Sequence, residues 1–151
     1  MAGPASSCFA GAYCWLRHIT CGRPFDDSFL KPPPGQSADD GLVAVAALTL
    51  NPETNRWQRA AFSTGGSYLD IAAPGVKLKT ASAEDRAWYS AREGTSFAAP
   101  LVSGALAILR QAHPTWSSAQ IEAALKAHAQ SLTGESADTV GAGMLNLRDL
   151  P

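Results

Sequence analysis

The sequence predicts an α/β fold in which several short strands precede two helices. The first observation is the apolar run "LVAVAALTL" at 42–50, bounded by Gly41 and Asn51-Pro52. Such a run is typical of a strand covered on both faces, as in parallel sheets. The second is the segment from Ser96 to Leu109, which carries no charge and has no polar face, so it predicts a helix buried on all sides.

Composition restricts the class of protein. Hydrophobic residues make up 46% of the 151 residues and charged residues 17%, which indicates a globular domain. The net charge of −1 gives no reason to expect nucleic acid or an anionic membrane as a partner. The longest uncharged run is too short to span a bilayer. No Lys or Arg precedes the apolar patch at the N-terminus, so a signal peptide is not expected and the localisation stays open.

Residues 1–38 form an unassigned leader or loop. It contains all the cysteines of the chain, and three proline residues in a row at 32–34 exclude regular structure there. The cysteines are Cys8, Cys14 and Cys21. A metal site from Cys14 and His18, one helical turn apart, is conceivable, but the odd count without a paired CxxC pattern favours free thiols.

Four short strands are expected after 42–50, each separated from the next by turn residues. They lie at 57–63, 68–73, 76–81 and 87–92. The strand at 76–81 alternates apolar and polar residues, so one of its faces should meet solvent.

The first helix is expected from Ser96 to about Gln111, with Pro100 in its early turns, where the absent N–H costs least. The second helix has a clear start, because Ser117 and Gln120 have the spacing of a capping box. Trp116 and Ile121 flank that cap as a hydrophobic staple. Gly134 is the expected stop.

The Gly94-Thr95-Ser96 triplet at the start of the uncharged helix is a chemically sensible mount for a nucleophile. A helix N-terminus carries unpaired N–H groups and a partial positive charge, which favour loss of a proton from a hydroxyl and stabilise an oxyanion. Gly94 permits a sharp turn and a close approach of substrate. For an isolated triplet, the simpler interpretation is that Thr95 or Ser96 is a helix N-cap.

The surrounding motifs resemble those of the subtilisin-like serine proteases. The G-T-S-x-A-x-P pattern of the family's active serine is met by Gly94, Thr95, Ser96, Ala98 and Pro100. The stretch "FSTGG" that begins with Phe62 and Ser63 resembles the family's F-S-x-x-G segment, and Ala73, Pro74 and Gly75 match its A-P-G segment. The segments "HPTWSSAQIEAALKAHA" and "GAGMLNL" resemble its last helix and closing segment. Sedolisins share a similar serine motif, but the other segments favour subtilases.

The resemblance covers roughly residues 33–148 and implies a mostly parallel sheet, helices on both faces and the serine helix through the middle. It implies that Ser96 is the nucleophile of a peptide-bond hydrolase and that Thr95 helps to shape the oxyanion hole. Residues 39–151 would be the C-terminal part of the catalytic domain, and the N-terminal half would be missing. Calcium is possible by family, but the sequence identifies no cofactor or metal site. Subtilases are usually secreted.

The chain departs from the family before the serine. Subtilases supply their triad in the order Asp, His, Ser, yet His18 is the one histidine before Ser96, and the first carboxylate is Asp26. The family's oxyanion asparagine has no counterpart, since no Asn precedes Asn51. We therefore expect the chain alone to be inactive, with a peptide or protein as substrate and the missing half as a possible partner. The alternative is a non-catalytic scaffold that binds a protein.

Other triad orders fit less well. An α/β-hydrolase order would need Glu122 and then His128, and position 98 lacks that family's glycine. With His113 in place of His128, no acid lies between Ser96 and the histidine. A chymotrypsin-like order would use His18 and either Asp26 or Asp39, without the surrounding motif of that class.

Overall fold

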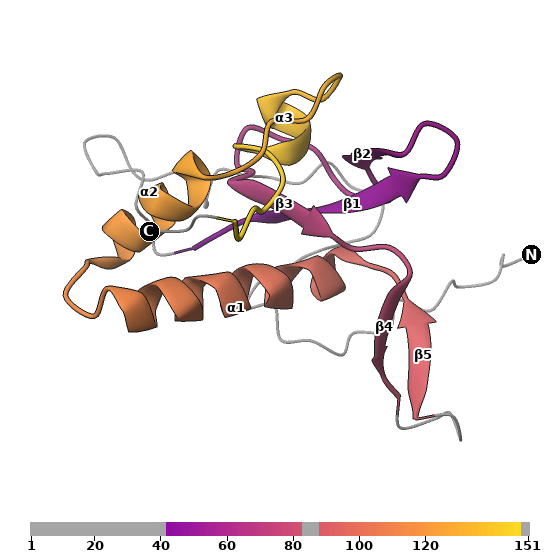
Figure 1. Cartoon of the computed structure of the whole chain (residues 1–151). Helices are drawn as coiled ribbons and strands as arrows, with labels where there is room; N and C mark the ends of the chain where they lie inside the picture. Colours follow the sequence, from indigo (N-terminus) through magenta and orange to yellow (C-terminus); the bar gives the residue numbers. More distant parts are fainter. Residues whose placement is uncertain (1–41, 83–87, 149–151) are drawn as a thin grey trace, which may run out of the picture.

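The computed structural model describes residues 42–82 and 88–148. Predictions for the leader, including its three cysteines, His18 and Asp26, and the prediction for Asp39 lie outside these residues. The elements run in the order β1 (Val45–Asn51), β2 (Arg56–Arg59), β3 (Ile71–Pro74), β4 (Leu78–Ala81), β5 (Tyr89–Arg92), α1 (Thr95–Ala112), α2 (Ser118–Ala127) and α3 (Ala137–Val140) (Figure 1). The chain contains both strands and helices, which is consistent with the expected α/β class.

The main sheet has the order β2-β1-β3 and is mixed. β1 and β3 are parallel, with Val45 opposite Ile71 and Leu48 opposite Pro74. β1 and β2 are antiparallel, because the turn at 52–55 is too short for a crossover and returns the chain beside itself. We had expected a mostly parallel sheet. Within the described residues one strand pair is parallel and the other is antiparallel, so this expectation is not confirmed there.

β1 is covered on both faces, as its sequence predicted. Ala47 belongs to the core that β1 and β3 share with α1 and α2. Its neighbours Ala46 and Leu48 point to a second cluster with Val140 of α3. This alternation follows from the two-residue period of a strand. Figure 1 shows α1 on one side of the sheet and α3 on the other.

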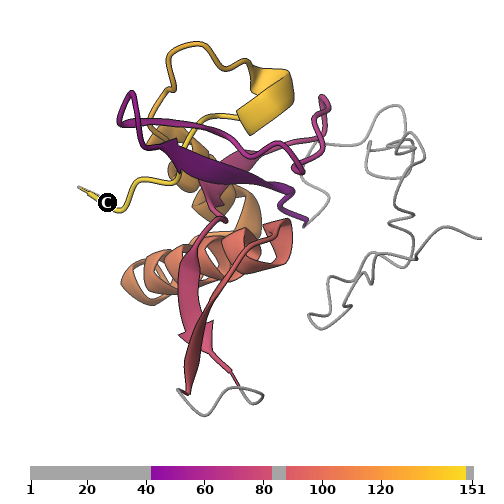
Figure 2. The same ribbon diagram turned by 90° about the vertical axis from the view of Figure 1, so that its right-hand side faces the viewer.

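β4 and β5 form a separate two-stranded antiparallel sheet. It projects away from the main sheet beside the first turn of α1 (Figures 1 and 2). Residues along β4 alternate between half-buried and exposed, which confirms the one-sided pattern expected for 76–81.

α1 is buried along one face and open on the other. Ala98, Val102, Ala105 and Leu109 are buried against the sheet, at the spacing of a single helix face. Leu101 and Ile108 on the remaining surface are 41% and 55% exposed. The prediction of a helix buried on all sides is thus wrong for the described residues, because the sheet and α2 cover one face of it.

The capping box of α2 is confirmed. The Gln120 N–H donates to Ser117 Oγ (3.2 Å), and the Ser117 N–H donates to Gln120 Oε1 (2.8 Å). The helix ends at Ala127 with His128 as its C-cap, so the expected stop at Gly134 is wrong. Gly134, with φ at 89°, instead lies in the loop before α3. No described helix has both the length and the apolar character needed to cross a bilayer.

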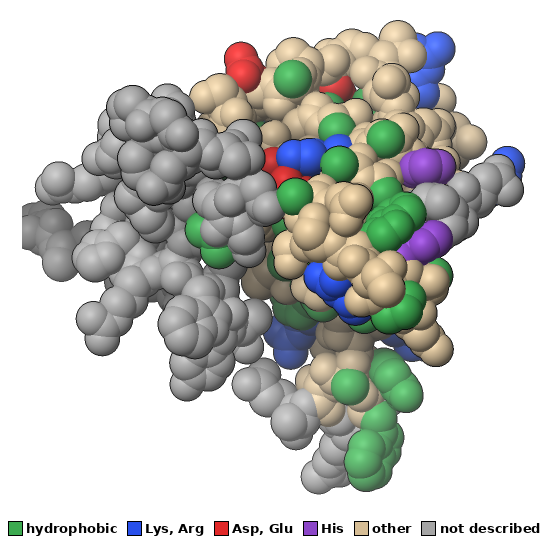
Figure 3. Space-filling model, turned by 90° about the vertical axis from the view of Figure 1, so that its left-hand side faces the viewer, with side chains coloured by type: hydrophobic (Ala, Val, Ile, Leu, Met, Phe, Trp, Pro, Cys, Tyr) green, Lys and Arg blue, Asp and Glu red, His purple; other side chains and the backbone are tan. Residues whose placement is uncertain are grey.

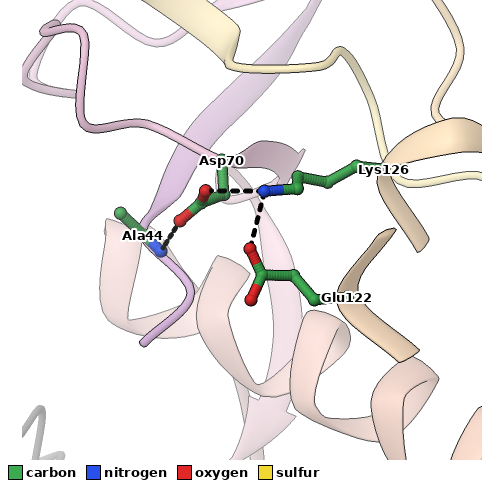
Figure 4. A network of polar contacts seen from close by, with 4 residues as sticks. All are labelled: Ala44, Asp70, Glu122 and Lys126. Carbon is green, nitrogen blue, oxygen red and sulfur yellow. Dashed lines mark hydrogen bonds and ion pairs between the residues drawn. The ribbon is translucent and has the colours of Figure 1, made fainter. Parts of the chain in front are cut away.

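A polar network joins α2 to the strands (Figure 4). Lys126 Nζ lies 2.6 Å from Glu122 Oε1 and 3.2 Å from Asp70 Oδ1. The other Asp70 oxygen accepts a hydrogen bond from the Ala44 N–H (2.8 Å). Burial lowers the pKa of Lys126, but the hydrogen bonds and charges of Glu122 and Asp70 outweigh it, so the pKa is raised above its ordinary value.

Candidate active site

Ser96 is the second residue of α1, and its side chain is exposed. The N-cap is Gly94, and within the described residues neither the Thr95 nor the Ser96 hydroxyl caps a backbone N–H of the helix. The simpler interpretation, in which one of these hydroxyls is a helix N-cap, is therefore wrong. A Cβ added at Gly94 would lie 3.2 Å from Ser96 Oγ, so the hydroxyl oxygen lies close to the backbone of this turn.

Gly94 makes the turn that presents Ser96. Its φ of 148° and ψ of 156° are a backbone conformation that side-chain-bearing residues rarely adopt. Its carbonyl accepts the Phe97 N–H at 3.1 Å, which closes the first turn. No acidic residue lies in the first turn of α1, so the partial positive charge there is not neutralised within the helix.

The turn is fixed to the C-terminal end of the parallel strand pair. The Gly94 N–H donates to the Gly75 carbonyl (2.8 Å), and the Gly75 N–H donates to the Leu48 carbonyl (2.9 Å). Gly75 directly follows β3, and Leu48 is in β1. Ser96 therefore stands at the edge of the sheet where open α/β folds usually bind their ligands.

The A-P-G motif supplies the residue that touches this turn. Gly75 is buried, and a Cβ added there would come within 2.6 Å of Ala47 Cβ and 3.1 Å of the Gly94 carbonyl oxygen. A side chain does not fit without displacing one of these groups. The sequence identified Gly75 as a motif residue but not this contact.

The F-S-x-x-G motif supplies a serine that hydrogen-bonds the backbone of β1. Ser63 is 2% exposed, and its Oγ accepts the Ala47 N–H at 3.0 Å. The guanidinium of Arg59 donates to the Ser63 carbonyl. The strand expected at 57–63 is therefore only partly right, because β2 ends at Arg59 and the chain then turns so that Ser63 reaches β1.

The two histidines in the described part of the chain lie far from Ser96. His113 is the C-cap of α1 and stacks on Trp116, with ring centroids 3.7 Å apart. Seventeen residues of helix at about 1.5 Å each separate it from Ser96 by about 25 Å. His128 ends α2, and its Nδ1 is 2.9 Å from the Ala124 carbonyl. Figure 3 shows both histidines (purple) on the face at the C-terminal end of α1.

The α/β-hydrolase order is consequently not assembled. Glu122 is held by Lys126 on α2, and both described histidines are helix C-caps on the face at the C-terminal end of α1, away from its N-terminus (Figure 3). The residues of the chymotrypsin-like order are outside the described residues. Among residues 42–82 and 88–148, no three His, Cys, Asp or Glu side chains come together as metal ligands would.

Comparison with known proteins agrees with the motifs. A sequence model of the Subtilase family matches residues 30–143. Subtilisin BL from Lederbergia lenta is 43% identical over 149 residues, which cover 87% of this chain and 54% of that protein. Subtilisin from Bacillus pumilus is 42% identical over 91 residues, 60% of this chain and 32% of that protein. The chain thus spans about half, or less, of the length of these curated relatives.

Solved structures give the same result. Fervidolysin from Fervidobacterium pennivorans, a keratinolytic enzyme related to subtilisin, matches with a TM-score of 0.63 at 28% identity, over 74% of this chain and 20% of that one. MycP1 from Mycobacterium smegmatis matches with a TM-score of 0.58 at 29% identity, over 71% and 28%. The sequence match over most of the chain and these structural matches lead to one conclusion: the chain belongs to the subtilase family.

Proposed function

We propose that this chain contributes the nucleophile of a serine-type endopeptidase and that Ser96 is that nucleophile. The observation that carries the proposal is the position of the Ser96 hydroxyl. It is exposed, it caps no backbone N–H of α1, and it lies at the N-terminus of α1 beside the C-terminal end of the parallel strands. Membership of the subtilase family supports serine-type peptidase chemistry in general.

In this mechanism Ser96 Oγ attacks the carbonyl carbon of a peptide bond. A base takes the hydroxyl proton as the Oγ–carbon bond forms, and the tetrahedral oxyanion collapses to an acyl-enzyme. The base then gives that proton to the leaving amine as the carbon–nitrogen bond breaks. Water attacks the ester in the same way and releases the second product.

Two features of the turn support a role in stabilising the oxyanion. The Ser96 N–H is among the first N–H groups of α1, which have no partner inside their own helix. Such a group can donate to the developing negative charge, with the helix dipole aligned behind it. Gly94 has no side chain to obstruct substrate, and Thr95, half-buried beside it, would shape the wall of this hole.

We propose that the base, its orienting acid and the asparagine donor come from polypeptide outside the described residues. The support is that both described histidines lie at the other end of α1 or on α2 and that the relatives are about twice as long or longer. Since His18, the one histidine before Ser96, has no carboxylate before it and so does not fit the family order Asp, His, Ser, we expect the 151-residue chain alone to hydrolyse peptides very slowly. In subtilisin itself, loss of the triad costs on the order of a million-fold in rate.

The experiment is casein hydrolysis by the chain alone and by the chain mixed with a polypeptide carrying the Asp, His and Asn segments of a subtilisin, each beside Ser96→Ala. We expect no cleavage alone and Ser96-dependent cleavage in the mixture. Cleavage that survives Ser96→Ala would contradict the nucleophile assignment. A mixture that forms a complex without any cleavage would favour the alternative, a non-catalytic scaffold that binds a protein partner.

A further inference from the structure

We infer that Gly75, after β3, is a positioning residue for Ser96. The inference rests on the proposed role of Ser96 as nucleophile. It starts from a continuous series of backbone contacts that leads from the sheet to the turn before α1. The Leu48 carbonyl accepts the Gly75 N–H, and the Gly75 carbonyl accepts the Gly94 N–H, at 2.9 and 2.8 Å.

These contacts hold the turn close against the sheet. Because Gly75 has no side chain, Ala47 and Gly94 can both approach its backbone closely. A Cβ at this position would lie 2.6 Å from Ala47 Cβ and 3.1 Å from the Gly94 oxygen. Gly75 has no positive φ, so the requirement is for space and not for an unusual backbone conformation. The residue therefore sets how closely the turn approaches β1.

Ala47 is itself fixed and cannot yield easily. It is fully buried, its N–H donates to Ser63 Oγ (3.0 Å), and its carbonyl accepts the Ala60 N–H (2.8 Å). A larger residue at position 75 would consequently push against a rigid wall. The displacement would fall on the side of Gly94, which carries Ser96 two residues later.

Such a displacement matters for the reaction. Ser96 Oγ and the Ser96 N–H act from the same turn, so both move with Gly94. A shift of about 1 Å in a reacting group can reduce a rate by about a hundredfold. We therefore expect Gly75→Ala to lower the reactivity of Ser96 while its chemistry remains intact.

The variants separate positioning from folding. Gly75→Ala introduces these contacts, whereas the double variant Ala47→Gly with Gly75→Ala removes the one at 2.6 Å and retains those with the Gly94 oxygen (3.1 Å) and the Cα of residue 47 (3.2 Å). Gly104→Ala is the matched control, since a Cβ there meets nothing within 4 Å. We expect the double variant to recover stability without recovering the position of the turn.

The first readout needs no catalysis and uses the full 151-residue chain. Amide exchange measured by NMR is compared at Gly94, whose N–H bonds Gly75, and at Gln130, whose N–H bonds the Met144 carbonyl at 2.8 Å. We expect Gly94 to exchange about tenfold faster than in the parent chain in both Gly75 variants, and Gln130 in the double variant to keep its parent rate. If amide exchange in the double variant is accelerated equally at Gly94 and Gln130, including through global unfolding, the inference is overturned.

The second readout is the rate at which a fluorophosphonate labels Ser96 in the mixture with the subtilisin-derived segment. We expect labelling about tenfold slower or more in both Gly75 variants and unchanged in Gly104→Ala. Equal labelling in all variants would overturn the positioning role. If the parent chain is not labelled at all, the nucleophile proposal fails, and the exchange readout alone decides whether Gly75 holds the turn.

Discussion

Replacing Lys126 by methionine tests the polar network that fastens α2 to the strands. The ammonium lies within 3.2 Å of both Glu122 and Asp70, whose side chains are 11% and 22% exposed. Removing one partner of a fully buried ion pair costs about 3–5 kcal/mol. The Lys126 side chain is 36% exposed, so solvent screening reduces the expected loss to about 1–2 kcal/mol.

The assay is urea unfolding followed by circular dichroism at neutral pH. With a dependence on urea of about 1 kcal/mol per molar, the midpoint should fall by about 1–2 M. Lys77→Met is the control, since Lys77 is exposed. Adding Glu122→Gln to Lys126→Met should recover part of the loss, because it removes an uncompensated carboxylate. A Lys126→Met midpoint equal to that of the control would refute the reasoning.

Three further results are expected. Leu109→Ala should cost about 2–5 kcal/mol of unfolding free energy because Leu109 is fully buried, whereas Ile108→Ala next to it should change stability by less than about 0.5 kcal/mol; equal urea midpoints would contradict this. The chain should self-associate or bind a hydrophobic dye through the exposed face of α1. The double variant Leu101→Lys with Ile108→Lys should reduce self-association in sedimentation and dye binding in fluorescence. If neither measurement changes, that face is not responsible. The folded state raises the pKa of Lys126, so the contribution of the charged ammonium to stability should be complete below the ordinary value of 10.5 and lost as pH rises through the raised value. The difference in unfolding free energy between the parent chain and Lys126→Met must therefore shrink in alkaline unfolding titrations.

Local signals in the sequence predicted most elements of this fold. The apolar run at 42–50 predicted β1, and the spacing of Ser117 and Gln120 predicted the start of α2, because both depend on residues near one another in the chain. The end of β2 was missed because Ser63 turns to satisfy the Ala47 N–H, which is sixteen positions away. The exposed face of α1 was missed because apolar residues indicate what a helix can bury, not what covers it.

The same distinction applies to the candidate site. The motif around Ser96 predicted a hydroxyl at the start of a helix, which the structure confirms, and the structure shows that this side chain is exposed. The contact between Gly75 and Gly94 joins residues nineteen positions apart, and its closeness depends on the buried methyl group of Ala47. No local pattern indicates such a contact, so the glycine of the A-P-G motif was identified from family resemblance without a physical reason for it.

The most direct test of the central claim is to locate the serine that a fluorophosphonate modifies. The chain would be labelled with and without the polypeptide that carries the subtilisin Asp, His and Asn segments, digested, and mapped by mass spectrometry. The account predicts a single adduct on Ser96, formed much faster in the mixture and absent from Ser96→Ala. An adduct on Ser103, an exposed serine of the same helix, at the same rate as on Ser96 would contradict it, and so would a mixture in which Ser96 gains no reactivity.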